Sequence, residues 1–69
     1  MPLTFASAGE ENTVKEIRGK DETRRFLESL GFTVGGKVIV VTDMGGNLIV
    51  NVRDSRIALS HSMANRIMV

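Results

Sequence analysis

The chain has 69 residues, with nine basic and eight acidic side chains and a formal net charge of +1. The length allows a single domain, residues 1–69. The absence of cysteine excludes disulfide scaffolds, thiolate zinc sites and iron–sulfur clusters. A charge near zero provides no long-range field for nucleic acid or acidic membranes. Without a signal peptide or an apolar run of roughly 20 residues, we expect a cytoplasmic protein with no direct membrane insertion.

The first regular segment is Glu11–Arg18, which we predict to be a strand. Its apolar residues, Val14 and Ile17, have a helical spacing, but Asn12 to Val14 are poor helix formers. A bulge or twist in the strand would let both side chains point inward. Gly19 is expected to end it.

Residues Asp21–Leu30 form the only good helix pattern in the chain. Asp21 is expected to cap the first turn. After the helix, Gly31 can adopt a left-handed conformation, and Phe32 can then fold back onto the helix. The apolar residues expected to face the core are Phe26, Leu27 and Leu30.

The C-terminal half of the chain reads as a three-stranded meander followed by one helical turn and a last strand. Two glycines in Asp43–Asn47 permit the positive φ of a hairpin turn, and Ser60 is expected to cap the helical turn. Five short strands at this length favour a small SH3-like β-barrel, mainly β, with a helix after the first strand. The predicted elements are strands Lys37–Thr42, Leu48–Arg53 and Arg56–Leu59, a turn at Asp54–Ser55, a helical turn at His61–Ala64, and a strand at Arg66–Val69 with Ile67 and Val69 inward.

No motif in the chain predicts catalysis. Gly31–Lys37 matches the start of a phosphate-binding loop, but a helix precedes it, a strand follows it, and Val38 replaces the magnesium-binding hydroxyl. His61 is the only histidine, and a metal site needs three or four ligands. We therefore expect no enzyme activity, no catalytic residue and no resident cofactor, with at most a weak or subunit-shared site for Fe²⁺ or Zn²⁺.

The strands carry more apolar residues than the interior of a small barrel can hold. Successive side chains alternate between faces, so Ile39, Val41 and Ile49 are expected to point outward. Either the helix stripe together with Leu3 and Phe5 covers them, or they form an apolar patch that meets a partner.

The order of these segments resembles the ferrous iron transport protein A (FeoA) family over most of the chain, from about Gly9 to Val69. The resemblance rests on residues 14–19, 25–32 and 36–38, the Gly46 hairpin, residues 57–59 and residues 64–69. Val34 departs from the family pattern, which often has proline before the glycine turn.

The resemblance implies an SH3-like barrel with an inserted helix that acts as a cytosolic accessory protein of bacterial Fe²⁺ uptake. The implied partner is ferrous iron transport protein B, a membrane permease with a GTP-binding domain, and the protein would lie at the inner face of the membrane through that partner. An arginine, Arg53 or Arg56, could enter the GTPase site. The residues expected to contact the partner are Leu30, Phe32, Ile39, Val41, Ile49, Arg53 and Arg56.

Other functions remain open from the sequence. The barrel could bind RNA or DNA, although few aromatic side chains are available for stacking on bases, so no nucleic acid is expected. Similar domains also form the C-terminal part of iron-dependent repressors. A homo-oligomer is a further possibility, because so small a core rarely supplies more than about 3–5 kcal/mol of net stability.

Overall fold

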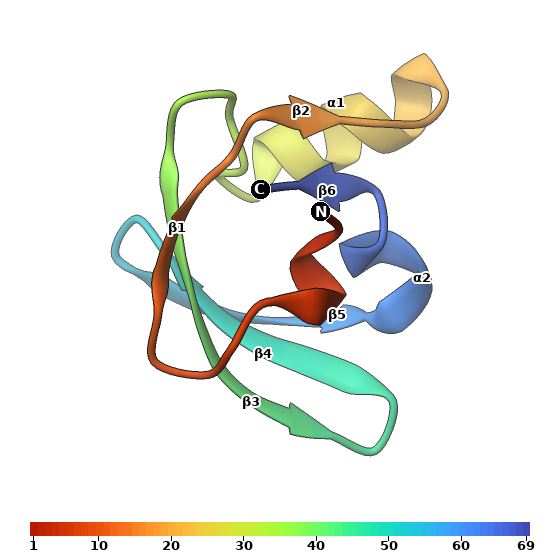
Figure 1. Ribbon diagram of the computed structural model, residues 1–69. Coiled ribbons are helices and arrows are strands. Elements are labelled where there is room, and N and C mark those ends of the chain that lie inside the picture. Colours follow the sequence, from red (N-terminus) through yellow and green to blue (C-terminus); the bar gives the residue numbers. More distant parts are fainter.

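The computed structural model describes all residues, 1–69, and its strands are short and separated by tight turns (Figure 1). In chain order the elements are η1 (Leu3–Phe5), β1 (Glu11–Thr13), β2 (Glu16–Ile17), α1 (Asp21–Ser29), β3 (Lys37–Met44), β4 (Asn47–Val52), β5 (Ser55–Ser60), α2 (His61–Ala64) and β6 (Ile67–Met68).

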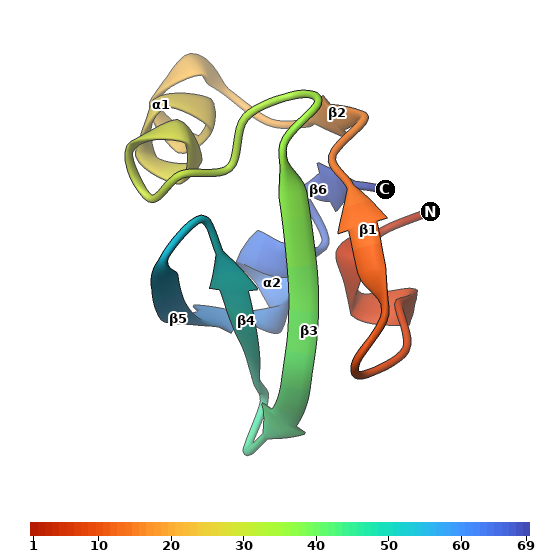
Figure 2. The ribbon, with the colours of Figure 1, turned by 90° about the vertical axis from the view of Figure 1, so that its left-hand side faces the viewer.

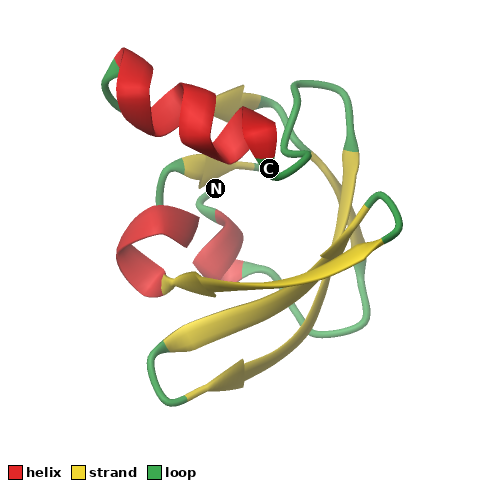
Figure 3. Ribbon diagram, turned by 180° about the vertical axis from the view of Figure 1, so that it is seen from behind, coloured by secondary structure: helices red, strands yellow, loops and turns green.

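The strands form two antiparallel sheets that together make a small barrel. The larger sheet has the order β1-β3-β4-β5, and the smaller one pairs β2 with β6. The larger sheet curves around the core, and the helices lie along its open side (Figure 3). The predicted barrel with a helix near its start is confirmed, but it has six strands instead of five.

The additional strand arises because the segment predicted as one bulged strand is divided between the two sheets. The backbone N–H of Val14 donates to the carbonyl of Gly36 (2.9 Å), whereas that of Lys15 donates to Met68 (2.8 Å). The chain therefore changes partner between these two residues, with β1 before the change and β2 after it. Val14 is buried and Ile17 is partly buried, so both side chains do point inward as expected.

The two ends of the chain lie together beside β6 (Figure 1). The N-terminal amine of Met1 donates to the carbonyl of Val69, and the N–H of Val69 donates to the carbonyl of Met1, each over 2.8 Å. Pro2 also pairs with Met68 in an isolated bridge. The smaller sheet thus gains a short third segment from the N-terminus, which places Leu3 in the core.

The start of helix α1 differs from the prediction, whereas its C-terminal end agrees with it. Lys20, not Asp21, is the N-cap residue, and it makes no side-chain cap hydrogen bond. Asp21 already belongs to the first turn of the helix, where its negative charge interacts favourably with the helix dipole. At the other end the prediction is confirmed: Gly31 has φ +109°, and the N–H of Phe32 donates to the carbonyl of Leu27 over 3.1 Å.

The two hairpin turns of the larger sheet use positive φ in different ways. Gly45 and Gly46 both have positive φ, as the predicted β3–β4 hairpin requires. The second turn lies one residue earlier than predicted, since Ser55 already pairs with Val52. Its first residue, Arg53, has φ +53° and is the only non-glycine residue with positive φ.

The core contains 13 buried residues, all of them apolar, and no buried polar side chain. Leu27 and Leu30 of the predicted helix stripe contact the core, but Phe26 is 51% exposed. Leu27, and not its neighbour Phe26, is therefore the helix residue that points into the core. Ser60 caps α2 as expected, accepting from the N–H of Met63, and both Ile67 and Val69 are buried.

Candidate functional site

The outer surface of the larger sheet brings together four of the seven residues predicted to bind a partner. Ile39 on β3 lies opposite Glu11 on β1 and Asn51 on β4. Asn51 in turn lies opposite Arg56 on β5. Directly opposed residues share a face of a sheet, so these side chains form one row across all four strands. Figure 2 looks onto this side, with β1, β3 and β4 next to one another. We define the outer sheet face as Glu11, Lys37, Ile39, Ile49, Asn51, Arg53 and Arg56.

Part of this row forms the wall of a shallow hollow of about 230 Å³. The hollow is lined by Glu11, Lys37, Ile39, Asn51 and Arg53. Lys37 and Asn51 were not predicted, because a lysine and an asparagine in a strand pattern look like ordinary solvent-exposed positions. The strand alternation that placed Ile39 outward also places Lys37 outward, but only the cross-strand register brings Asn51 and Arg53 beside them.

The basic side chains of the outer sheet face have only neutral partners. Nε of Arg56 donates to Oδ1 of Asn51 over 3.2 Å, and Nζ of Lys37 donates to Oγ1 of Thr13 over 2.8 Å. The ion pairs of the protein join Arg18 to Glu16, Arg24 to Asp21, and His61 to Asp43. None of the three cations on this face takes part in one, so their charges remain free for an external group.

Arg53 lies between the sheet and the C-terminal end of α1. Its side chain passes close to Gly31: a Cβ built on that glycine would stand 3.4 Å from Cδ of Arg53 and 3.6 Å from Nε. These are ordinary van der Waals distances, so it is the left-handed φ of +109° that requires glycine at the end of the helix. The Arg53 side chain thus lies against the helix end as well as beside the hollow.

The remaining predicted partner-binding residues are placed differently. Ile49 is partly buried and lies opposite Thr42 and Ala58. Val41 is the extra residue where the β3–β4 register shifts, and it is partly buried too. Leu30 packs partly against the core. The prediction for Phe32 is wrong: its side chain is 0% exposed, because the Gly31 turn directs it into the core next to Leu27.

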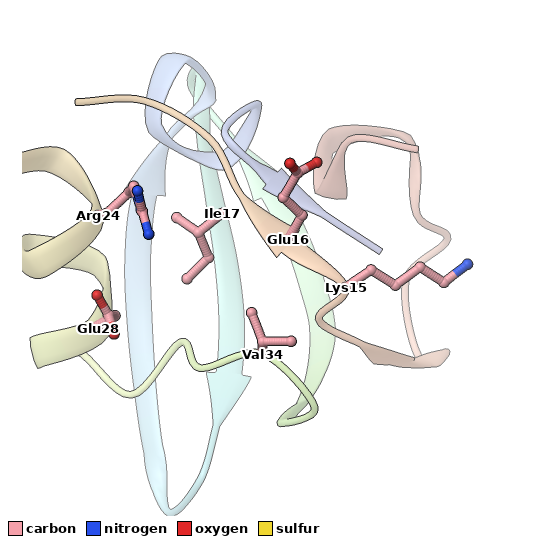
Figure 4. A pocket seen from close by; sticks show the side chains of 6 residues that line it. All are labelled: Lys15, Glu16, Ile17, Arg24, Glu28 and Val34. Carbon is pink, nitrogen blue, oxygen red and sulfur yellow. The ribbon is translucent and has the colours of Figure 1, made fainter. Parts of the chain in front are cut away.

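A second hollow, of about 260 Å³, lies between β2, α1 and the loop that follows the helix (Figure 4). It is lined by Lys15, Glu16, Ile17, Arg24, Glu28 and Val34. Two cations and two carboxylates line it, so its charges balance. In Figure 4 the side chain of Lys15 extends away from the helix, while Arg24 and Glu28 lie on the opposite wall. None of these residues was predicted to contact a partner.

Several large apolar side chains outside the outer sheet face are exposed. Leu3 and Phe5 were the N-terminal residues that could cover the outward apolar side chains. Leu3 is buried in the core, but Phe5 is 73% exposed. The others are Met1, Phe26, Val34 and Met44. Met1, Phe26 and Val34 belong to the N-terminus, to α1 and to the loop after it, whereas Met44 ends β3, the strand that also carries Ile39.

The segment that resembles a phosphate-binding loop and the single histidine lie in an ordinary turn and on the surface. Gly31–Lys37 joins the end of α1 to β3 through a turn in which the N–H of Gly36 donates to Thr33. His61 is partly exposed, and its Nε2 lies 2.9 Å from the carboxylate of Asp43. No group of three or more His, Cys, Asp or Glu side chains is placed to hold a metal ion. No helix has the length and apolar character needed to cross a bilayer.

The fold and this surface define a small SH3-like barrel with an inserted helix and a charged and apolar sheet face. Two solved structures share the fold. One is an iron uptake regulatory protein (FeoA), with a TM-score of 0.87, 32% identity, and coverage of 96% of this chain and 88% of that one. The other, from Stenotrophomonas maltophilia, is a FeoA complexed with zinc and described as an SH3 domain protein; its TM-score is 0.85, its identity 30%, and the coverage 99% and 87%.

The family follows from the whole length of the sequence. The FeoA domain model matches residues 1–69. A protein of Methanocaldococcus jannaschii, described as a proposed Fe(2+) transport protein A, is 37% identical over 68 residues, which are 99% of this chain and 83% of the relative. The chain belongs to the FeoA domain family, as the resemblance predicted. The descriptions of these relatives connect the family with ferrous iron transport.

Proposed function

We propose that this protein is a cytoplasmic accessory protein of ferrous iron uptake that acts by docking on the ferrous iron permease, ferrous iron transport protein B. Membership of the FeoA family supports the link to iron transport. The observation that carries the docking mode is the outer sheet face, where Ile39 and Ile49 lie beside three cations that form no ion pair within the chain. In this proposal the protein reaches the inner face of the membrane through its partner.

Docking on the GTP-binding domain of the permease gives the arginines a second possible role. Arg53 lies on a turn and Arg56 near the start of an edge strand, so both can reach beyond the sheet. An arginine that stabilises the developing charge of GTP hydrolysis raises the rate by about 10³–10⁵. Regulation by contact alone would change turnover far less. The size of the rate change therefore separates the two mechanisms.

The test is a pull-down of the soluble GTP-binding domain of the permease, with and without GTP, followed by a GTP turnover assay. We expect capture by the wild-type chain and loss of capture by the double variant Ile39→Thr/Ile49→Thr, which keeps β-branched side chains in the strands. The arginine mechanism is tested with Arg53→Glu. Its matched control is Arg25→Glu, on the exposed side of α1. Absence of capture by the wild-type chain would refute docking on this domain, and unchanged turnover would refute the arginine mechanism.

Nucleic-acid binding is the weaker alternative, because the aromatic side chains are in the wrong places. Phe32 is buried, while Phe5 belongs to η1 and Phe26 to α1. None of them lies on the strands of the outer sheet face, and stacking of bases on aromatic side chains is the usual source of affinity for single strands. Binding that weakens steeply between low and moderate salt would favour this alternative.

A further inference from the structure

We propose that the hollow on the outer sheet face binds a carboxylate side chain from an acidic and apolar segment of a protein partner. This inference rests on the proposed docking function and adds to it the chemistry of the contact. The first observation is the concentration of charge. Lys37 and Arg53 line the hollow, and Arg56 is anchored to Asn51 in its wall. Glu11 is the only carboxylate among the lining residues.

The second observation is that hydrogen-bond donors on this face remain free. Lys37 gives one of its three N–H groups to Thr13, so two remain. Oδ1 of Asn51 accepts from Arg56, which leaves the Asn51 amide nitrogen as a donor. Arg53 makes no side-chain hydrogen bond and keeps all its donors. Charge-assisted bonds to a carboxylate are the strongest use of such donors.

The third observation is the backbone of Arg53. A left-handed φ of +53° is unfavourable for arginine, and glycine or asparagine would occupy it with less strain. Strained backbone positions of this kind cluster at functional sites. Here the strained turn and the close approach of Gly31 hold the arginine beside the hollow.

The surface fits an acidic polypeptide better than a nucleic acid. Two of its cations line one hollow next to Ile39 and the third contacts Asn51 in its wall, whereas a phosphate backbone needs an extended basic groove with aromatic platforms. Ile39 and Ile49 follow one another on the side of the hollow away from Lys37 and Arg53, where they would accept apolar side chains next to the bound carboxylate. The partner segment would then carry apolar residues beside its acidic ones, as in an extended strand.

The experiment is an NMR titration of the isotopically labelled full chain with a capped peptide of alternating leucine and glutamate. Its counterpart of leucine and glutamine and a short oligothymidylate are titrated separately. We expect shifts centred on Lys37, Asn51 and Arg53 with the glutamate peptide, and at least tenfold weaker binding of the glutamine peptide. Arg53→Asn and Lys37→Gln should each weaken binding of the glutamate peptide about tenfold, whereas Arg25→Gln on α1 should leave it unchanged.

Three results would overturn the inference: absence of binding, shifts centred on another surface, or equal binding of the glutamine peptide. Tighter binding of the oligothymidylate at the same residues would also overturn it in favour of nucleic acid. The pull-down separates this inference from the proposed function. If the permease domain is captured equally by wild type and by Lys37→Gln/Arg53→Asn, docking stands and this inference fails. If the peptide binds as expected but the domain is not captured, the carboxylate site stands and the permease proposal fails.

Discussion

Arg53 crosses Gly31 where the β4–β5 turn meets the end of α1, and both residues have positive φ, +53° and +109°. Figure 2 shows this turn beside the helix. One residue provides the space that the other fills. The contact couples the helix to the outer sheet face, so a change at either residue should alter both stability and the position of the guanidinium group.

The first prediction concerns Gly31. Gly31→Ala should lower the free energy of unfolding by about 1–3 kcal/mol, because a side chain at φ +109° is strained. Chemical denaturation measures the loss. Gly35→Ala is the comparison, since it has a φ of +87° and open space around its Cβ. The two costs should be similar, because the Arg53 atoms stand only at van der Waals distance from the Gly31 Cβ. A much larger cost at Gly31 would show that the Arg53 side chain cannot make room for the methyl group.

The second prediction concerns the strained turn residue. Arg53→Asn should change the free energy of unfolding by less than about 1 kcal/mol, because asparagine tolerates a left-handed backbone. Arg53→Val should lower it by about 1–3 kcal/mol, since a β-branched residue does not. Thermal unfolding of both variants tests the pair. A large loss in Arg53→Asn would mean that the side chain stabilises the fold, not only a partner contact.

The third prediction separates the two phenylalanines on either side of the helix end. Phe32→Ala should cost about 3–5 kcal/mol, because its buried side chain would leave a cavity. That is as much as so small a core supplies, so the variant should be largely unfolded by circular dichroism. Phe26→Ala, at an exposed position, should stay within about 1 kcal/mol of wild type. A folded, stable Phe32→Ala would contradict the burial of this side chain.

The fourth prediction concerns metal ions. Calorimetric titration with Zn²⁺ or Fe²⁺ should show no tight site within one chain, because no three ligating side chains converge. Any weak heat should disappear in His61→Ala, which removes the imidazole from its pair with Asp43. Saturation at one ion per two chains would instead indicate a site shared between subunits.

Local sequence patterns were sufficient for most of the elements. The left-handed glycine after α1, the two glycines of the β3–β4 hairpin and the serine cap of α2 each follow from chemistry within a few residues. The order of the strands along the chain could also be predicted, since each short β-branched segment is bounded by turn residues. These features depend on backbone conformations that a residue and its nearest neighbours specify.

The errors occurred where partners distant in the sequence decide the outcome. Phe26 and Phe32 look equally apolar in the sequence, yet Phe26 is exposed and Phe32 is buried, because the turn at Gly31 brings Phe32 back against the core side of α1. The segment Glu11–Arg18 is divided because Val14 and Lys15 find hydrogen-bond partners in different sheets. No pattern inside that segment contains this information.

The candidate site shows the same division. The sequence by itself determined the family, the barrel and the outward direction of Ile39 and Ile49, since strand alternation is a local property. Only the tertiary structure decided that Lys37, Asn51 and Arg53 share one hollow with Ile39. Their meeting depends on the register between β3 and β4 and on the helix end that holds Arg53, which the chain establishes only when the barrel closes.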